Sequence, residues 1–163
     1  MDRLWSPWRY SYIANHSTDA ACIFCTKPAE NNDRENLIVF RGQWNFVILN
    51  AFPYTNGHVM IAPYEHVASL ESTDTATVEE MMRLTRDAER HIRAAYKPDG
   101  LNLGMNLGEA AGAGIAGHIH MHVLPRWRGD ANFLSVIGET RVLPESLDST
   151  YEKLKARFEN QSD

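Results

Sequence analysis

The chain has 163 residues, of which 44% are hydrophobic and 23% are charged, and its formal net charge is −5. This length suits one domain with a full core, and the ordinary balance of apolar and charged residues excludes a disordered chain. This negative net charge provides no overall positive potential to attract the phosphates of a nucleic acid, so we expect no polymeric nucleic acid among the partners.

The first residues carry many aromatic side chains without the period of a helix or a strand. Residues 1–20 include Trp5, Trp8, Tyr10 and Tyr12, and we expect an aromatic arm packed over the body or across a subunit boundary. They contain no signal-peptide-like apolar segment, and the longest apolar runs in the chain are far too short to span a bilayer. The sequence therefore predicts a cytoplasmic protein without a membrane partner.

The chain contains two cysteines, which stand three residues apart in Cys22-Ile23-Phe24-Cys25. Two cysteines are too few for a disulfide-stapled secreted domain. In a reducing compartment this spacing indicates a pair of metal ligands or a redox pair, and two small buried side chains are the remaining alternative. We expect a tight knuckle here, followed by a loop-like stretch over residues 26–35.

Three short segments rich in β-branched and aromatic residues follow, with turn residues between them. We expect strands over residues 36–40, 44–50 and 58–63, the first two joined as a hairpin by a short connection that contains glycine. Pro63 should end the third strand, because proline cannot donate to a sheet ladder. His66 then lies in the loop beyond it.

Residues 75–95 show the clearest helical period, with apolar side chains three and four residues apart. We expect Met81 and Met82 in the core, Glu80 on the polar side and His91 in solvent or at the edge. The apolar stripe is expected to cover one face of the sheet.

A fourth strand and a glycine-rich loop come next. Residues 101–107 alternate apolar residues with small or polar ones, as a strand does. The loop over residues 108–117 holds four glycines, whose backbone N–H groups could lie against a phosphate or could serve only the turn. Further on, residues 131–143 are predicted to be irregular and residues 145–158 to form a second amphipathic helix.

Three histidines alternate with apolar residues in the segment His118-Ile119-His120-Met121-His122. In an extended chain the imidazoles project to one side and the apolar residues to the other. One face of the segment then holds the reactive histidines, and the other face belongs to the hydrophobic core. Imidazole is largely neutral near pH 7 and can serve as nucleophile, base or metal ligand. Surface histidines on a polar strand face are the plain alternative.

The predicted elements indicate an α+β fold. The histidine segment completes five short strands that are joined mostly by turns, with one long helix between the third and the fourth. We expect a five-stranded antiparallel sheet with the long helix across one face and a helix at the C-terminal end.

The three histidines allow two divisions of labour. In the first, one histidine attacks phosphorus while its neighbours orient the ring and donate to phosphate oxygens. In the second, all three bind a catalytic zinc that keeps an open position for water. Cys22, Cys25 and His66 weigh against the second, because one triad histidine would complete with them a closed, structural Cys₂His₂ site.

The segment from His118 to Arg126 resembles the signature of the histidine-triad (HIT) family of nucleotide hydrolases and transferases. Residues 50–66 are similar to that family's second strand, turn and third strand, and the cysteine pair resembles its zinc-bearing branch. Residues 126–145 resemble the bacterial diadenosine-tetraphosphate phosphorylase-like branch. The resemblance implies one HIT-like domain with a core over residues 20–130, preceded by the arm and followed by a C-terminal extension over residues 131–163.

The resemblance also implies a role for each matching residue. His120 would attack the α-phosphorus and carry the nucleotidyl group, and His122 would contact phosphate or the leaving group. The residues implied at the substrate are Asn50 at the ribose, His58 beside the site, Asn106 near the bridging region, and the backbone of Gly114 and Gly117. The implied ligands of a structural zinc are Cys22, Cys25, His66 and His118.

One departure from the family pattern concerns residues 112–117, which lack the Gln or Ser that many relatives carry before the triad. Phosphate would then bind backbone N–H groups alone, and the acceptor, water or inorganic phosphate, stays open. The leading prediction is an enzyme that cleaves dinucleoside polyphosphates or related adenylylated compounds through a nucleotidyl-histidine intermediate. The alternatives are a hydrolase with zinc on the triad and a nucleotide-binding sensor without turnover. The resemblance also implies a homodimer.

Overall fold

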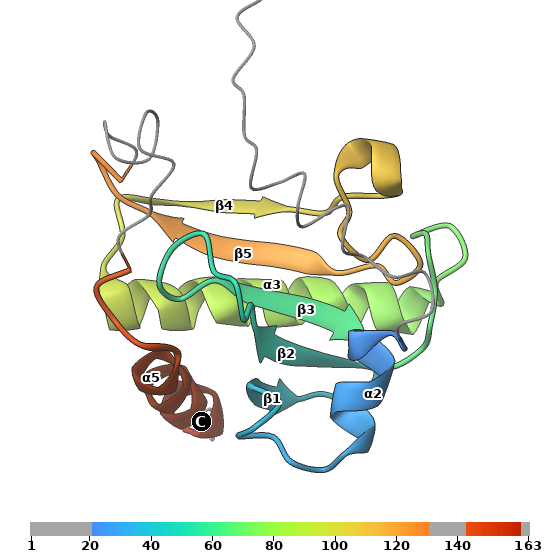
Figure 1. Cartoon of the computed structure of the whole chain (residues 1–163), viewed down its shortest axis with the longest axis horizontal. Coiled ribbons are helices and arrows are strands. Elements are labelled where there is room, and N and C mark those ends of the chain that lie inside the picture. The colour runs from blue at the N-terminus through green and yellow to red at the C-terminus, as the bar shows by residue number, and fades with distance from the viewer. Residues whose placement is uncertain (1–20, 131–142, 161–163) are drawn as a thin grey trace, which may run out of the picture.

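The computed structural model describes residues 21–130 and 143–160 of the chain. In this part of the chain five antiparallel strands form one sheet in the order β1-β2-β3-β5-β4 (Figure 1). The strands are β1 (Ile38–Arg41), β2 (Asn45–Leu49), β3 (Val59–Pro63), β4 (Gly100–Gly104) and β5 (Met121–Arg126). The helices are α2 (Ile23–Ala29), α3 (Thr75–Tyr96) and α5 (Leu147–Glu159), with a 3₁₀ turn, η1, at Glu109–Ala111. The predicted α+β class is confirmed.

Two of the predicted segments fall on residues that the structure does not describe. The aromatic arm over residues 1–20 lies outside the described residues, as does nearly all of the irregular segment predicted over residues 131–143. The division of a single domain into arm, core and C-terminal extension therefore stays a prediction.

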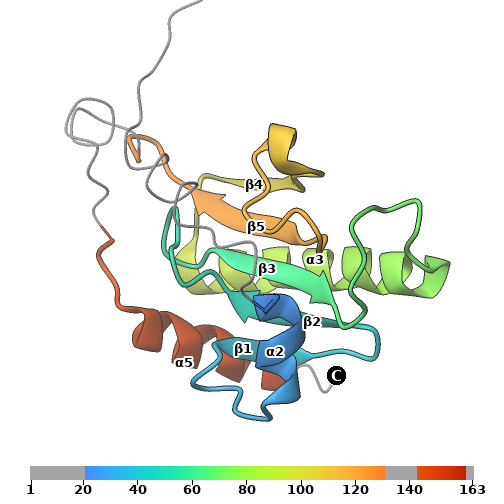
Figure 2. The ribbon, with the colours of Figure 1, turned by 45° about the vertical axis from the view of Figure 1, so that its right-hand side comes forward.

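The sheet is covered on both faces, which explains why β2 and β3 are buried at every position. Figures 1 and 2 show α3 behind the sheet and α2 in front of it. On the α3 side, Met81, Leu84 and Ile92 pack in one apolar cluster with Val47 and other strand residues. On the α2 side, a second cluster is formed by Phe24, Ile38, Phe46, Ile48, Met60 and Ala62. Burial of these two clusters supplies the main driving force for the fold.

Helix α3 forms where its period predicts, but three of its side chains are placed differently. Met82 is 53% exposed, since it stands about 100° around the helix from the buried Met81. Glu80 is only 4% exposed, because its carboxylate accepts hydrogen bonds from the backbone N–H groups of residues 43, 44 and 45 in the β1–β2 turn. His91 is buried against Phe158 of α5, with the ring centroids 4.6 Å apart. The predictions of a core Met82, a polar-side Glu80 and a solvated or edge His91 are therefore wrong.

Some boundaries also differ from the predicted ones. Helix α2 replaces the predicted knuckle and the first part of the loop over residues 26–35. Strand β4 ends at Gly104, and β5 begins only at Met121, so His118 and His120 precede the strand and His122 lies within it. In the part of the chain that the structure describes, no helix is long and apolar enough to cross a bilayer.

Candidate active site and metal cluster

The histidine segment separates its side chains onto two faces, as the alternation predicts. Ile119 and Val123 are buried in the cluster beneath α3. His122 pairs across the sheet with Met60, which belongs to the cluster beneath α2, and paired residues project to the same side of a sheet. The rings of His118 and His120 both contact Phe24 of α2. The three imidazoles therefore share the α2 side, although only His122 belongs to the strand.

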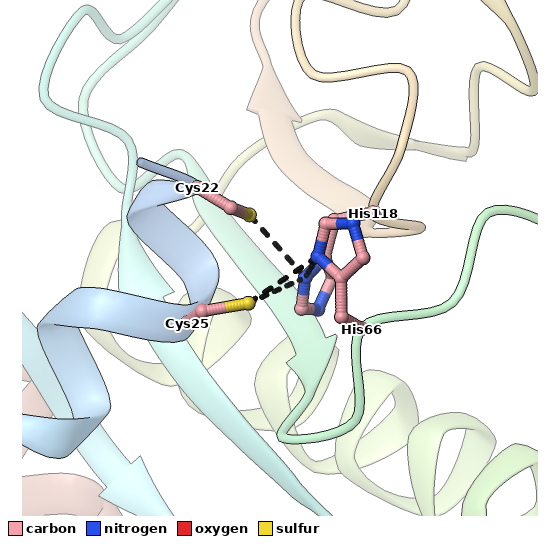
Figure 3. A group of neighbouring side chains, drawn as sticks. All are labelled: Cys22, Cys25, His66 and His118. Atoms are coloured by element: carbon pink, nitrogen blue, oxygen red, sulfur yellow. Dashed lines mark hydrogen bonds between the residues drawn. The ribbon is translucent and has the colours of Figure 1, made fainter. Parts of the chain in front are cut away.

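Four side chains from three separate segments meet at the end of the sheet nearest α2 (Figure 3). We call this group, Cys22, Cys25, His66 and His118, the metal cluster. Cys22 and Cys25 come from the start of α2, His66 from the loop after β3, and His118 from the segment before β5. Their ligand atoms all lie within 4.8 Å of one another. His118 Nδ1 is 3.4 Å from Cys22 Sγ, 3.6 Å from Cys25 Sγ and 3.3 Å from His66 Nδ1. Cys25 Sγ is also 3.3 Å from His66 Nδ1.

These spacings suit a tetrahedral zinc ion. Ordinary Zn–S and Zn–N bond lengths with tetrahedral angles place sulfur and nitrogen ligands about 3.6 Å apart and two nitrogen ligands about 3.3 Å apart. The four distances above agree with those values to within about 0.3 Å. Burial and the neighbouring Cys22 thiol raise the pKa of Cys25, and a bound dication would reverse that effect by favouring the thiolate.

The hydrogen bond of His118 fixes which of its nitrogens can bind a metal. His118 Nε2 lies 2.9 Å from the carbonyl oxygen of Pro63, which can only accept, so Nε2 carries the proton. Nδ1 is then unprotonated and faces the two cysteines, as a neutral imidazole ligand must. Both nitrogens of His118 are thus engaged away from His120 and His122, which argues against zinc on the triad.

His120 is held in one tautomer by the main chain. His120 Nδ1 donates to the carbonyl oxygen of His118 over 2.9 Å, so the lone pair is on Nε2. The residue is only 6% exposed, and this burial lowers the pKa of His120. A neutral imidazole with an unprotonated Nε2 can act as a nucleophile at pH 7.

The tautomer of His122 is set by two linked hydrogen bonds, one accepted and one donated by His58. The backbone N–H of Tyr54 donates to His58 Nδ1 over 3.3 Å, so the proton of His58 is on Nε2. His58 Nε2 then donates to His122 Nδ1 over 2.9 Å, which leaves the proton of His122 on Nε2. Burial, with a smaller effect from His120, lowers the pKa of His122 to about 4. His122 is therefore neutral at pH 7 and can offer an N–H donor from Nε2.

Asn50, which directly follows β2, also contacts His58. Its Nδ2 lies 3.4 Å from His58 Nδ1, and its Oδ1 accepts from the backbone N–H of Phe52 over 2.9 Å. The structure thus brings together Asn50, His58 and His122, which the sequence places in two distant segments.

The remaining predicted substrate residues belong to the segment before the triad. Asn106 Nδ2 donates to the carbonyl oxygen of Gly112 over 3.4 Å, and Gly114 is half-buried in the same loop. Gly117 lies beside the metal cluster, because a Cβ placed on it would come within 3.4 Å of His66 Nε2. These contacts place Asn106 against the glycine-rich loop and Gly117 beside His66.

Two aromatic residues of this site, Phe24 and Tyr54, are not among those predicted from the sequence. The ring of Phe24 lies 4.7 Å from that of His120, and the ring of Tyr54 lies 5.0 Å from that of His58. The position of Phe24 between the two cysteines is a signal that could have identified it. Nothing in the sequence marks Tyr54.

Known proteins resemble this chain over most of its length. A model of the HIT domain matches residues 31–129. A protein of Mycobacterium tuberculosis (strain ATCC 25618 / H37Rv) named AP-4-A phosphorylase is 39% identical over 169 residues, which cover 99% of this chain and 86% of that protein. An uncharacterized 16.1 kDa HIT-like protein of Mycoplasma pneumoniae is 29% identical over 133 residues, which cover 82% of this chain and 89% of that protein.

Solved structures show the same fold. A Zn-bound histidine triad family protein from Mycobacterium smegmatis superposes with a TM-score of 0.68 at 27% identity, over 85% of this chain and 94% of that chain. A hypothetical histidine triad nucleotide-binding protein from Sulfolobus tokodaii gives a TM-score of 0.68 at 26% identity, over 85% of this chain and 93% of that chain.

Proposed function

This chain belongs to the HIT-domain family, and from that membership and the geometry of the site we propose that it cleaves dinucleoside polyphosphates through a nucleotidyl intermediate on His120. The single observation that carries the proposal is the fixed tautomer of His120, whose Nδ1 proton is held by the His118 carbonyl oxygen. The nucleophilic lone pair is thereby placed on Nε2. The name of the Mycobacterium tuberculosis relative supports a diadenosine-tetraphosphate-like substrate.

In the first step, the Nε2 lone pair of His120 forms a bond to the α-phosphorus. The bond from that phosphorus to the bridging oxygen breaks, and its electron pair leaves with the remaining nucleoside polyphosphate. In the second step, water or inorganic phosphate attacks the phosphorus and releases His120. Charge builds on the phosphate oxygens in both steps, so positioned N–H donors lower the barriers.

We assign this donor role to His122. Its Nε2 proton, set by the bond from His58, can be donated to a non-bridging or leaving oxygen. We assign the ribose to Asn50 and the bridging region to Asn106, while His58 orients His122. Without a side-chain donor before the triad, the backbone N–H groups at Gly114 and Gly117 would support the phosphate.

Cys22, Cys25, His66 and His118 would hold a structural zinc ion. A closed set of four protein ligands leaves no position for substrate, so the ion would supply stability and would not take part in either step. Cysteine ligands must stay reduced to bind a metal, which favours a reducing compartment such as the cytoplasm.

We further infer that two chains pair through β4. This strand is an edge of the sheet, and its exposed main chain is a template for pairing with a second copy. Leu103 of β4 and Leu107 just after it are both exposed, and such apolar residues lose contact with water in a dimer. A sedimentation measurement that finds only monomers at micromolar concentration would refute this part of the proposal.

The central experiment is product analysis with diadenosine tetraphosphate, with and without inorganic phosphate. ADP with ATP would identify phosphorolysis, and AMP with ATP would identify hydrolysis. The variant His120→Ala should lose turnover but keep nucleotide binding. When the reaction of the parent chain is quenched without acid, a nucleotidyl group should be found on His120. A control variant, His91→Asn, changes a histidine outside the site and should retain turnover. Full activity in His120→Ala, or nucleotide binding without any turnover in the parent chain, would refute the proposal.

A further inference from the structure

One side chain of helix α2, that of Phe24, contacts both His118 of the metal cluster and His120. Cys22 and Cys25 project from the start of this helix into the metal cluster (Figure 3). Phe24, which lies between them, projects onto the sheet and is 1% exposed. It packs there in the apolar cluster on the α2 side of the sheet.

The ring of Phe24 contacts two of the three triad histidines. Its centroid lies 4.7 Å from that of His120, with an interplanar angle of 35°, and 5.3 Å from that of His118, with an angle of 49°. These separations fall in the range in which aromatic rings attract one another. The ring of His120 also meets that of His122 at 4.8 Å. The ring of His120 therefore contacts those of both Phe24 and His122.

These contacts complement the hydrogen bond of His120. The bond from Nδ1 to the His118 carbonyl oxygen fixes one edge of the imidazole, but a single bond leaves the ring able to tilt about that edge. Packing against Phe24 restricts the tilt, so the bond and the ring contact together fix the direction of Nε2. Direction matters, because an error of about 1 Å in the position of a reacting group can cost about a hundredfold in rate.

The position of Phe24 itself depends on what anchors α2. A helix of seven residues is not stable alone, and the N-cap residue, Cys22, makes no side-chain capping bond. The C-terminal end of α2 is held by Arg41, which donates to the Pro28 carbonyl oxygen, and by Asn36, which donates to the Lys27 carbonyl oxygen. At the N-terminal end, where Phe24 lies, Cys22 contacts His118 and Cys25 contacts both His118 and His66.

We propose that Phe24 is a positioning residue for His120 and that the metal cluster holds Phe24 in place. The assignment rests on the proposed function, in which His120 is the nucleophile. It gives the metal cluster a role in aligning the nucleophile through packing.

The test compares Phe24→Leu with a matched control, Phe46→Leu. Both changes remove an aromatic ring from the same buried cluster, but within the described residues the ring of Phe46 stacks on Tyr64 and not on a triad histidine. For Phe24→Leu we expect kcat for diadenosine tetraphosphate to fall about tenfold to a hundredfold, with KM changed less than about twofold. For Phe46→Leu we expect kcat to stay within about threefold of the parent value. Zinc content, measured by elemental analysis, should stay at the parent level in both variants.

A second measurement does not depend on turnover. The carbon-bound ring protons of His120 lie near Phe24, so their NMR shifts should move in Phe24→Leu and stay in place in Phe46→Leu. Cys25→Ser, which removes a metal ligand without touching His120, should move the same signals in the same direction. This measurement distinguishes the two proposals, since it reports the position of His120 even in a protein that forms no nucleotidyl intermediate.

Three results would overturn the inference. One is an equal loss of kcat in Phe24→Leu and Phe46→Leu, which would indicate a general packing effect. Another is a rise in KM with unchanged kcat in Phe24→Leu, which would place Phe24 at the nucleotide. The third is an unchanged His120 spectrum in Cys25→Ser, which would disconnect the metal cluster from the nucleophile.

Discussion

Replacing His58 by phenylalanine tests whether His122 works through a fixed tautomer. The change keeps a ring in a site that is 1% exposed but removes the N–H that donates to His122 Nδ1 over 2.9 Å. Without that donor, the proton of His122 can move to Nδ1, and the Nε2 donor to phosphate is lost. A hydrogen bond to a charged group contributes about 1.5 to 3 kcal/mol, so kcat should fall about tenfold to 150-fold.

The assay is steady-state turnover of diadenosine tetraphosphate, combined with a double-mutant cycle. If His58 acts through His122, its replacement should cost almost nothing further in a His122→Ala background, because both changes remove the same interaction. His58→Gln can still donate an amide N–H and should recover part of the loss. Thermal melting of each variant checks the fold. Parent-like kcat in His58→Phe, or multiplicative losses in the double variant, would refute the relay from His58 to His122.

The other predictions concern the metal, pH and the β1–β2 turn. Cys25→Ser, or prolonged chelation, should remove bound zinc and lower the melting temperature by at least about 5 °C, as measured by elemental analysis and calorimetry; an unchanged melting temperature would exclude a structural ion. Burial lowers the pKa of His122 to about 4 and also lowers the pKa of His120 below 6.5. In a pH–kcat profile, activity should therefore persist below pH 6.5 and be lost only when the pH falls below the lowered pKa values of these two histidines. Folding stability should decrease as pH falls below 6.5, since the unfolded chain then binds protons that the buried rings exclude; melts that are flat from pH 7 to pH 5 would contradict this. Glu80→Ala should lower the unfolding free energy by about 2 to 4 kcal/mol in denaturant titrations, because it leaves backbone N–H groups of the turn unpaired, whereas the exposed Glu79→Ala should cost under about 0.5 kcal/mol.

The local sequence pattern predicts helices and strands well where apolar residues recur with one dominant period. The three-and-four spacing locates α3 to within one residue of its observed end, and the alternation around His120 assigns its imidazole and the side chain of Ile119 to opposite faces. Periodicity succeeds here because it reflects which side of an element faces the core, and that property is decided within the element itself.

The local pattern gives the wrong environment for a residue where a distant partner overrides it. Glu80 lies on the polar side of α3 by composition, yet it is buried because the β1–β2 turn directs its backbone N–H groups at this carboxylate. Helix α2 is not predictable from residues 22 to 35, since seven residues with an internal proline form a helix only when tertiary contacts hold both ends. His91 is buried by Phe158, a residue almost seventy positions away in the chain.

The sequence by itself determined which residue types are available at the site: three imidazoles on one face, a cysteine pair, and the histidine after the third strand. Only the tertiary structure decided how they are divided, with His118 turned to the cysteines and His120 left to carry the free Nε2. The protonated nitrogen of each imidazole is set by a partner, and the partners of His118 and His122 are Pro63 and His58, more than fifty residues earlier in the chain. Tautomer and ligand choice depend on such long-range contacts, and no period in a sequence encodes them.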